Sequence, residues 1–497
     1  MAAALFQAEH VTAHEGERQN HRARLRKILP WTLAAALFTL YAALAVRDQQ
    51  EMTTTGYDLG IFDQAVRAYA HGHLPYSTLK GPHYDLLGDH FSPIIATLAP
   101  FYLLWPSAYT LLLAQAALLA VGVVPLSRWA TAELGARAGL AVGLSYGLSW
   151  GIASAAGFDF HEVAFGVPLL AFSATALGQR RVHTAVFWAL PLLLVKEDLG
   201  FTVAVIGLIA ATRGAKWLGL ATAIVGITGS VLEMEVLIPA ANPAGYAYTT
   251  SLFIGGPAHA GVAAHLLYDA AHLLTPHVKV ITVIQLLAPT AFLAARSPLI
   301  LLAVPTLAWR FLADDMMYWG TIFQYSAVLM PIVVAAFIEA LNRRRDRRDR
   351  PFRRFRRVRS SPRNAHFLAV GLIVTAVLLP SYPLAKLAHP TEWSTPARIA
   401  DARAVLERIP NGASVGASNT LIPQLTDRAT VYLFEPAMLR YVSWIVLDVQ
   451  GDGNTYPQSQ TAFSQLIATA ERDGFQIVEN RDGYLLLHRD RVTASER

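Results

Sequence analysis

The chain has 497 residues, of which 54% are hydrophobic and 15% charged, with a formal net charge of +6 and a mean hydropathy of +0.36. This apolar share exceeds that of most soluble proteins of similar length, so it predicts a polytopic α-helical membrane protein. The sequence contains no Cys, which excludes disulfides, thiolate nucleophiles and Cys-ligated metals.

Residues 1–27 predict a basic cytoplasmic tail, because a polar stretch is followed by Arg22, Arg24, Arg26 and Lys27 without a small-residue cleavage site. About eleven apolar segments follow, and a helix needs about 20 such residues to cross the hydrocarbon layer. We expect spans at residues 28–46, 107–128, 135–154, 163–178, 183–197, 199–212, 216–234, 279–295, 298–312, 323–341 and 366–385.

The loops between these segments alternate in charge. Loops rich in Arg and Lys alternate with loops rich in Asp, Glu and His, and the positive-inside rule assigns the basic loops to the cytoplasm. This pattern predicts a cytoplasmic N-terminus and, from the odd number of spans, an extracytoplasmic C-terminus. The loop 342–365 holds twelve arginines and two aspartates, which indicates contact with anionic lipid headgroups rather than with nucleic acid.

A separate domain is predicted after the transmembrane domain, which we place at residues 28–387. Residues 391–490 alternate between helical and β-prone patterns, which is typical of a small α/β domain. We expect helices at 397–408 and 457–472, and strands at 413–417, 430–434, 441–448, 474–478 and 483–488.

The first outer loop, residues 47–106, carries two carboxylates of interest. Asp58 closely follows the first span, where scarce water tends to raise the pKa of a carboxylate, and such a group suits general-base catalysis on a hydroxyl. The simpler alternative is that Asp58 caps a helix beginning at Leu59. Asp63 follows about one and a half helical turns later and is either a second catalytic carboxylate or part of a solvated face.

Asp89 and His90 come later in the same loop, before residues 91–105, which are apolar but too short to span. This pattern predicts a helix lying in the membrane interface. If this helix forms, Asp89 and His90 lie at its start, and we expect them to face one cavity together with Asp58. The alternative is an N-cap followed by a surface histidine.

The next outer turn places Asp159, His161 and Glu162 within four residues between two spans, where ionisable groups are costly unless they have a function. These side chains could bind a divalent cation, Mg²⁺ or Mn²⁺, or they could hydrogen-bond sugar hydroxyls. A plain loop with helix caps is the alternative.

Lys196, Glu197 and Asp198 interrupt an otherwise apolar stretch. A charged break at membrane depth is tolerated only where it is buried in protein or lines a wet cavity. Lys196 could hold a phosphate, or the three groups could simply neutralise one another.

Weaker candidates lie on the same predicted side. Arg310 could clamp a phosphate with two parallel hydrogen bonds, although pairing with Asp314 one turn later is simpler. Tyr325 is expected to face the cavity. The loop 239–278, which contains Tyr246, Tyr248, His265, His272 and His277, predicts an outer lid.

Several kinds of site are absent from the sequence. It has no Walker motif, no Gly-x-Gly-x-x-Gly after a strand and no Gly-x-Ser-x-Gly. Nucleotide hydrolysis, dinucleotide chemistry and serine-hydrolase chemistry are therefore not indicated.

Four motifs together resemble a known group. They read Tyr-Asp-Leu-Gly-Ile-Phe-Asp-Gln at 57–64, Asp-His-Phe-Ser-Pro at 89–93, Phe-His-Glu at 160–162 and Lys-Glu-Asp at 196–198. They are similar to motifs of the bacterial membrane proteins grouped as domain of unknown function 2079. The span count, the acidic motif after span one and the outer C-terminal domain also resemble the GT-C superfamily, whose integral-membrane glycosyltransferases use polyprenyl-phosphate sugars.

The resemblance implies a bacterial plasma-membrane enzyme in which a first-loop Asp deprotonates the acceptor hydroxyl. That role falls on Asp58, with Asp63 in reserve, and the His-Pro-type element corresponds to His90 and Pro93. The sequence has Asp-Leu-Gly where many GT-C members have Asp-Glu or Asp-x-Asp, so a divalent cation remains an open possibility. The expected substrate-binding residues are Tyr57, Asp89, His90, Asp159, His161, Glu162, Lys196, Glu197, Asp198, Arg310 and Tyr325.

We therefore expect an inverting transferase that moves a sugar from a polyprenyl-phosphate donor to a cell-envelope glycan or glycoprotein, in contact with the lipid bilayer and with no nucleic acid. One alternative is a transporter or flippase of a lipid-linked or anionic envelope precursor. The other is a non-catalytic membrane protein that binds an envelope component. The transferase hypothesis requires Asp58, His90, His161 and Lys196 to meet in one cavity.

Overall fold

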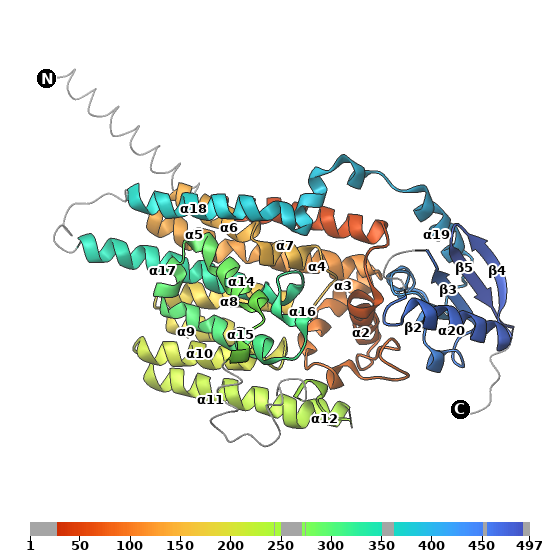
Figure 1. Cartoon of the computed structure of the whole chain (residues 1–497). Helices are drawn as coiled ribbons and strands as arrows, with labels where there is room; N and C mark the ends of the chain where they lie inside the picture. The colour runs from red at the N-terminus through yellow and green to blue at the C-terminus, as the bar shows by residue number, and fades with distance from the viewer. Residues whose placement is uncertain are drawn as a thin grey trace, which may run out of the picture.

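A computed structural model describes residues 27–242, 244–249, 271–273, 275–349, 362–450 and 455–490. The basic tail before Lys27, the lid histidine His265 and residues 350–361 of the Arg-rich loop lie outside the described residues. Figure 1 shows a bundle of long helices with a small mixed α/β domain against one end.

Within the described residues, five helices are long and apolar enough to cross a membrane: Lys27–Gln50, Ala108–Leu134, Lys216–Ala241, Gln324–Arg344 and Asn364–Ser381. Six shorter apolar helices accompany them: Pro93–Leu104, Val163–Gly178, Val182–Leu194, Leu199–Thr212, His277–Thr290 and Pro298–Leu312. All five long helices coincide with expected spans. The total of eleven spans stays a prediction, because the shorter helices do not reach the length that crossing requires.

The individual helical elements, in chain order, are α2 (Ile61–Ala70), α3 (Ala99–Leu104), α4 (Ala108–Val121), α5 (Val123–Leu134), α6 (Ala136–Gly147), α7 (Trp150–Ala156), α8 (Val163–Gly178), α9 (Val182–Ala189), α10 (Leu199–Thr212), α11 (Lys216–Leu232), α12 (Ile238–Ala241), α14 (His277–Leu287), α15 (Val304–Leu312), α16 (Met316–Trp319), α17 (Leu329–Asp349) and α18 (Pro362–Leu378). Short 3₁₀ or π turns extend several of them, including η1 (Gly56–Gly60) and η4 (Leu190–Leu194).

The expected span 183–197 ends early, and this decides where its charged residues lie. α9 passes into the 3₁₀ turn η4 at Leu190, where Pro191 removes a backbone donor, and the apolar helix ends at Leu194. Lys196 and Glu197 therefore lie in a turn outside the apolar segments.

Helices α10 and α11 pack with their backbones in close contact. A Cβ atom on Gly207 would lie 2.5 Å from the carbonyl oxygen of Gly219, and one on Gly226 would lie 2.4 Å from that of Gly200. Small residues permit this approach, as in many membrane helix pairs. The contact fixes the start of α10 and hence the turn at 196–198.

The C-terminal domain contains a five-stranded sheet in the order β2-β1-β3-β5-β4. Its strands are β1 (Ser414–Ala417), β2 (Thr430–Leu433), β3 (Trp444–Asp448), β4 (Gln476–Arg481) and β5 (Tyr484–His488), and its helices are α19 (Ala397–Glu407) and α20 (Gln460–Arg472). β1 pairs in parallel with β2 and β3, whereas β5 is antiparallel to β3 and β4. Every expected strand and helix of this domain has a counterpart.

This domain docks on the first outer loop through hydrogen bonds to backbone carbonyls. Arg67 Nη1 on α2 donates to the carbonyls of Thr426 (2.8 Å) and Ala429 (3.0 Å). Gln64 Nε2 and Thr78 Oγ1 both donate to the carbonyl of Val431, at 2.9 and 2.5 Å. Elements more than 350 residues apart in sequence thus form one polar interface.

Candidate functional site

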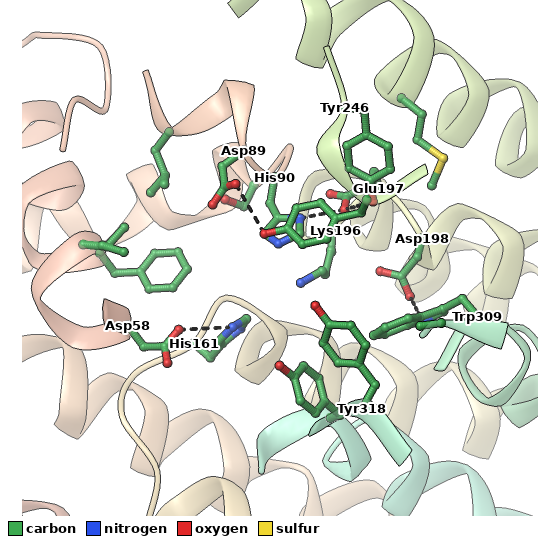
Figure 2. A pocket seen from close by; sticks show the side chains of 18 of the residues that line it. Asp58, Asp89, His90, His161, Lys196, Glu197, Asp198, Tyr246, Trp309 and Tyr318 are labelled. Atoms are coloured by element: carbon green, nitrogen blue, oxygen red, sulfur yellow. Dashed lines mark hydrogen bonds and ion pairs between the residues drawn. The ribbon is translucent and has the colours of Figure 1, made fainter. Parts of the chain in front are cut away.

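A cavity of about 750 Å³ opens between the loop 47–106, the turns at 157–162 and 196–198, and the C-terminal domain. It is lined by nine of the expected site residues: Tyr57, Asp58, Asp89, His90, His161, Lys196, Glu197, Asp198 and Tyr325. Figure 2 shows Asp58 and His161 on one side, Asp198 and Trp309 on the other, and the Lys196 ammonium between them. The structure therefore brings together the four residues that the transferase hypothesis requires.

Asp58 lies on the π-helical turn η1, which is held from two directions. The carboxylate of Asp159 accepts hydrogen bonds from the backbone N–H (2.9 Å) and Oγ1 (2.5 Å) of Thr55. The side-chain oxygen of Asn419, at the end of β1, accepts from the backbone N–H groups of Gly56 and Tyr57. Thr55 is the N-cap of η1, so Asp58 is not the cap that the simpler alternative proposed.

Glycine is needed on this turn because the C-terminal domain approaches it so closely. A Cβ atom on Gly56 would lie 2.5 Å from Cδ1 of Ile422, and one on Gly60 would lie 2.7 Å from Cγ2 of the same residue. Real Cβ atoms do not occupy such positions, so the Tyr-Asp-Leu-Gly sequence fits the domain that covers it.

A chain of ionisable groups runs from Asp58 into the protein. His161 Nε2 lies 3.8 Å from Asp58 Oδ1, and His161 Nδ1 lies 2.6 Å from Glu162 Oε2. The other oxygen of Glu162 accepts a hydrogen bond of 2.9 Å from Lys196 Nζ. Glu162 is fully buried behind His161 and Lys196, whereas 28% of the Asp58 side chain is exposed. Asp58 is thus the accessible end of the chain.

The turn that carries His161 is held by Gln115 of α4. Gln115 Oε1 accepts a hydrogen bond from the backbone N–H of His161, and its Nε2 donates to the carbonyls of Ala155 and Asp159. These bonds fix the orientation of the 157–162 turn.

Glu197 contacts several side chains of the cavity wall on the side of His90. Its Oε1 lies 2.7 Å from His90 Nδ1 and accepts a 2.7 Å hydrogen bond from the Tyr246 hydroxyl. The imidazole of His90 stacks on Tyr248, with ring centroids 4.5 Å apart. Asp89 pairs with Lys80 at 3.0 Å. His90 is therefore held by both a carboxylate and an aromatic ring, and it is not a free surface histidine.

The electrostatics separate the carboxylates into two groups. Burial opposes ionisation of Glu162, but His161 and Lys196 outweigh it, so the pKa of Glu162 lies well below its ordinary value. Burial also opposes ionisation of Glu197, yet His90 and Lys196 bring its pKa to about 2. Both are therefore ionised at neutral pH.

Asp58 and Asp198 behave differently. Burial raises the pKa of Asp58 in spite of the nearby His161, and it raises the pKa of Asp198 to about 7. The pKa of Lys196 lies well above its ordinary value, because Glu162 and Glu197 outweigh the effect of burial. The cavity thus contains a fixed ammonium and two carboxylates, Asp58 and Asp198, that hold a proton more tightly than an ordinary Asp does.

Asp63 does not lie in the cavity. It lies in the first turn of α2, after η1 has ended, and it is not among the residues that line the cavity. It is fully buried, and its Oδ2 accepts a hydrogen bond of 3.2 Å from Tyr102. It faces Thr426 and Asp427 of the C-terminal domain, which differs from both expectations, a second catalytic carboxylate and a solvated face.

The expected cation ligands also separate. Asp159 is engaged by Thr55 and lines a different, smaller cavity with Asp48 and Lys386, whereas His161 and Glu162 face each other. In the described part of the chain, no group of three or more His, Asp or Glu side chains could hold a metal ion. The residues present therefore do not fit the expected Mg²⁺ or Mn²⁺ site.

Arg310 has a different position from the one expected. It is fully buried, and its guanidinium donates to the carbonyls of Tyr318 (2.7 Å) and Gly320 (2.8 Å) and to Ser326 Oγ (3.0 Å). It does not pair with Asp314, and it is not among the residues that line the cavity. Instead it secures the loop that carries Tyr318 and Tyr325.

Sequence reasoning missed several residues of the cavity wall, mainly aromatic. Trp309 Nε1 donates to Asp198 Oδ2 (2.9 Å), and Tyr318 packs edge-on to Trp309 and to Tyr325. Tyr456 of the C-terminal domain packs edge-on to Tyr57, with ring centroids 5.3 Å apart. Aromatic residues at helix ends were the available signal, although many such residues only pack against lipid.

Comparisons with known proteins agree with this architecture. The model of the family described as "Predicted membrane protein (DUF2079)" matches residues 49–486, and the chain belongs to this family. The crystal structure of ArnT from Cupriavidus metallidurans in the apo state is 12% identical, with a TM-score of 0.51 over 91% of this chain and 97% of that one. The structure of ArnT from the same organism bound to undecaprenyl phosphate is 13% identical, with a TM-score of 0.54 over 93% and 99%.

No protein with a curated description matches the chain. The two structural matches show a fold shared with ArnT, and with the family they confirm the expected class, a multi-pass membrane protein.

Proposed function

We propose that this member of the DUF2079 family is a membrane glycosyltransferase, which transfers a sugar from a polyprenyl-phosphate donor to an extracytoplasmic envelope acceptor with inversion. The observation that carries the proposal is the single cavity in which an accessible carboxylate, Asp58, and a buried ammonium, Lys196, face the same space. The fold it shares with a structure bound to undecaprenyl phosphate supports a lipid phosphate as the donor carrier.

Asp58 is the proposed general base. Its carboxylate would take the proton of an acceptor hydroxyl while that oxygen forms a bond to the anomeric carbon of the sugar. The bond between the anomeric carbon and the phosphate oxygen breaks in the same step, and polyprenyl phosphate leaves. A single displacement of this kind inverts the anomeric configuration. His161 orients the Asp58 carboxylate, since its other nitrogen is fixed by Glu162.

Lys196 is the proposed phosphate-binding group. Glu162 engages one of its protons, and the ammonium otherwise faces the cavity (Figure 2). A positive charge fixed in a partly dry cavity stabilises the charge that develops on a departing phosphate. No step requires a metal ion held by Asp159, His161 and Glu162.

The cavity composition supports a lipid-linked donor. Its walls include apolar residues of the bundle, namely Phe201, Met234, Pro305, Ala308 and Leu312. They come from or adjoin apolar helices of the bundle. Tyr57, Lys80 and Tyr456 line the same cavity. We propose that the lipid donor enters between the bundle helices and that the water-soluble acceptor enters beside the C-terminal domain.

The interior of the bundle favours an enzyme over a transporter. α8 and α10 lead away from the cavity, and none of their buried side chains is ionisable; most are apolar, and the polar ones are Ser173, Thr175 and Thr202. A transport path for an anionic precursor needs polar groups along its length.

Purified protein incubated with a panel of polyprenyl-phosphate sugars and envelope glycans tests the proposal, with release of polyprenyl phosphate as the readout. We expect release with at least one donor, abolished in Asp58→Asn. Asp63→Asn is the matched control, because it removes the same charge from the same loop outside the cavity. Equal turnover in Asp58→Asn and wild type would contradict the assignment of the base.

A further inference from the structure

A second polar cavity lies at the other end of the helices that carry the candidate site. α8 begins just after Glu162 and ends at Gly178, and α10 begins just after Asp198 and ends at Thr212. The two turns that follow them enclose a cavity of about 390 Å³, lined by Arg180, Arg181, Val182, His183, Thr184, Arg213, Gly214 and Ala215. This end is the one that the charge pattern of the loops assigns to the cytoplasm.

The wall of this cavity is built around a buried arginine. The side chain of Arg213 is 7% exposed, and its guanidinium donates to the carbonyl of Leu177 and to Glu339 Oε1 (2.7 Å). Glu339 also pairs with Arg343 at 3.1 Å and accepts a hydrogen bond from Ser297. One carboxylate is therefore already shared between two arginines.

Arg180 and Arg181 add positive charge that nothing nearby neutralises. Within the described residues, neither is within ion-pair distance of a carboxylate, and both are exposed at the cavity rim. Arg180 adopts a left-handed backbone conformation with φ of 61°, which reverses the chain between α8 and α9. The turn thereby brings two adjacent arginines to the rim of one cavity opposite Arg213.

Backbone groups add to this positive potential. α9 begins at Val182 and α11 at Lys216, and neither helix has a side-chain cap at its N-terminus. The first-turn N–H groups of both helices therefore have no partner within their own helix, and they favour an anion. Val182, His183 and Thr184, which belong to the first turn of α9, themselves line the cavity.

Apolar side chains next to the cavity indicate where the anion comes from. Trp217, at the second position of α11, is 78% exposed, and Phe187, farther along α9, is 67% exposed. Both helices belong to the apolar helices of the bundle. Exposed aromatic and apolar groups beside a basic cavity fit a lipid, whose phosphate lies at the headgroup level and whose chains extend along the helices. A free phosphate ion would gain nothing from them.

We propose that this cavity binds the phosphate of an anionic phospholipid headgroup, with the exposed Arg180 and Arg181 as its ligands and the buried Arg213 as part of its wall. The site is independent of the proposed transferase chemistry, because it lies at the opposite end of α8 and α10.

The test measures lipid retention by the purified full-length chain in detergent, using native mass spectrometry. The probes are phosphatidylglycerol, phosphatidylcholine with the same acyl chains, and inorganic phosphate. We expect wild type to retain phosphatidylglycerol in preference to phosphatidylcholine, and Arg180→Ala/Arg181→Ala to retain it at least about tenfold less strongly.

The matched control is Arg128→Ala/Arg137→Ala. It removes two exposed arginines from α5 and α6 at the same end of the bundle, where Trp129 adjoins Gly178, without touching the cavity. Equal losses in both double variants would overturn the proposal in favour of general surface charge. Displacement of phosphatidylglycerol by equimolar inorganic phosphate would also overturn it, since the lipid chains would then contribute nothing.

Discussion

Asn419 holds Gly56 through two hydrogen bonds, with the backbone N–H of Gly56 lying 2.8 Å from the Asn419 carbonyl oxygen and 3.0 Å from its Oδ1. The two residues are 363 positions apart in sequence. Because Gly56 begins the turn that carries Asp58, the C-terminal domain directly fixes the orientation of the proposed general base.

Asn419→Ala should therefore weaken catalysis, although Asn419 is not proposed to contact the substrate. The change removes the side-chain acceptor of the Tyr57 backbone N–H, at a cost of about 1–3 kcal/mol in folding free energy, while the Gly56 N–H keeps the backbone carbonyl of residue 419. A displaced base lowers kcat by roughly tenfold to a hundredfold. Turnover assays with thermal unfolding would measure both effects. Asn419→Asp, which keeps the acceptor oxygen, should restore most activity, and failure of that rescue would argue against a positioning role.

Lys196→Met should reduce kcat and shift the acid limb of the pH profile. The charge of Lys196 lowers the pKa of Asp58, so its removal raises that pKa. As the pH is lowered, the variant should therefore lose activity at a higher pH than the wild type does. Loss of a preorganised cation costs on the order of 10²–10³ in kcat.

A double variant separates chemistry from folding at this pair. Lys196→Met leaves Glu162 as a buried charge without its ammonium partner, which costs about 3–5 kcal/mol in stability. Glu162→Gln/Lys196→Met should recover stability, and it should move the acid limb back to lower pH because Glu162 raises the pKa of Asp58. It should still turn over slowly. A double variant with wild-type kcat would contradict the phosphate-binding role.

Asp63→Asn should stabilise the protein at alkaline pH. Burial raises the pKa of Asp63 to about 7, above its unfolded value, so the folded state binds this proton more tightly. The contribution to stability is complete below about pH 4 and is lost as pH rises through 7, by an amount on the order of a few kcal/mol. Thermal unfolding should show a higher Tm for Asp63→Asn than for wild type at pH 8 and a smaller difference at pH 5. Identical Tm differences at both pH values would exclude this linkage.

Arg310→Met should act on structure rather than on donor binding. The change leaves the carbonyls of Tyr318 and Gly320 without their buried donor, which costs about 1–3 kcal/mol or more. Thermal unfolding should report a lower Tm. Turnover measured well below that Tm should keep the wild-type KM for the donor, and a selective rise in that KM would instead support the phosphate clamp expected from sequence.

Much of the architecture could be predicted from the sequence because membranes and sheets impose simple periodicities. Long apolar segments predicted helices such as Ala108–Leu134, and the β-prone segments from residue 413 onward predicted the strands. Lys196 and His161 could be predicted as site residues because charge between apolar helices is rarely without a partner or a function.

Other features depended on three-dimensional contacts that periodicity does not encode. Asp63 lies in the same motif as Asp58, yet it is buried outside the cavity, facing the docked domain. Asn419 and Tyr456 reach the site from a domain that the sequence pattern separates from it. Arg310 carries the charge that a phosphate clamp needs, but it donates instead to the carbonyls of Tyr318 and Gly320. No sequence pattern predicts that the loop after α15 folds back onto Arg310.

The close approach of Ile422 to Gly56 and Gly60 has a consequence for biosynthesis. A chain emerging from the ribosome completes its first outer loop long before residue 422 is made, and domains fold in the order of synthesis. The turn bearing Asp58 would therefore acquire its final shape only after residues 391–490 have been made and have folded against it. For the proposed transferase, such an arrangement delays turnover until the C-terminal domain is in place.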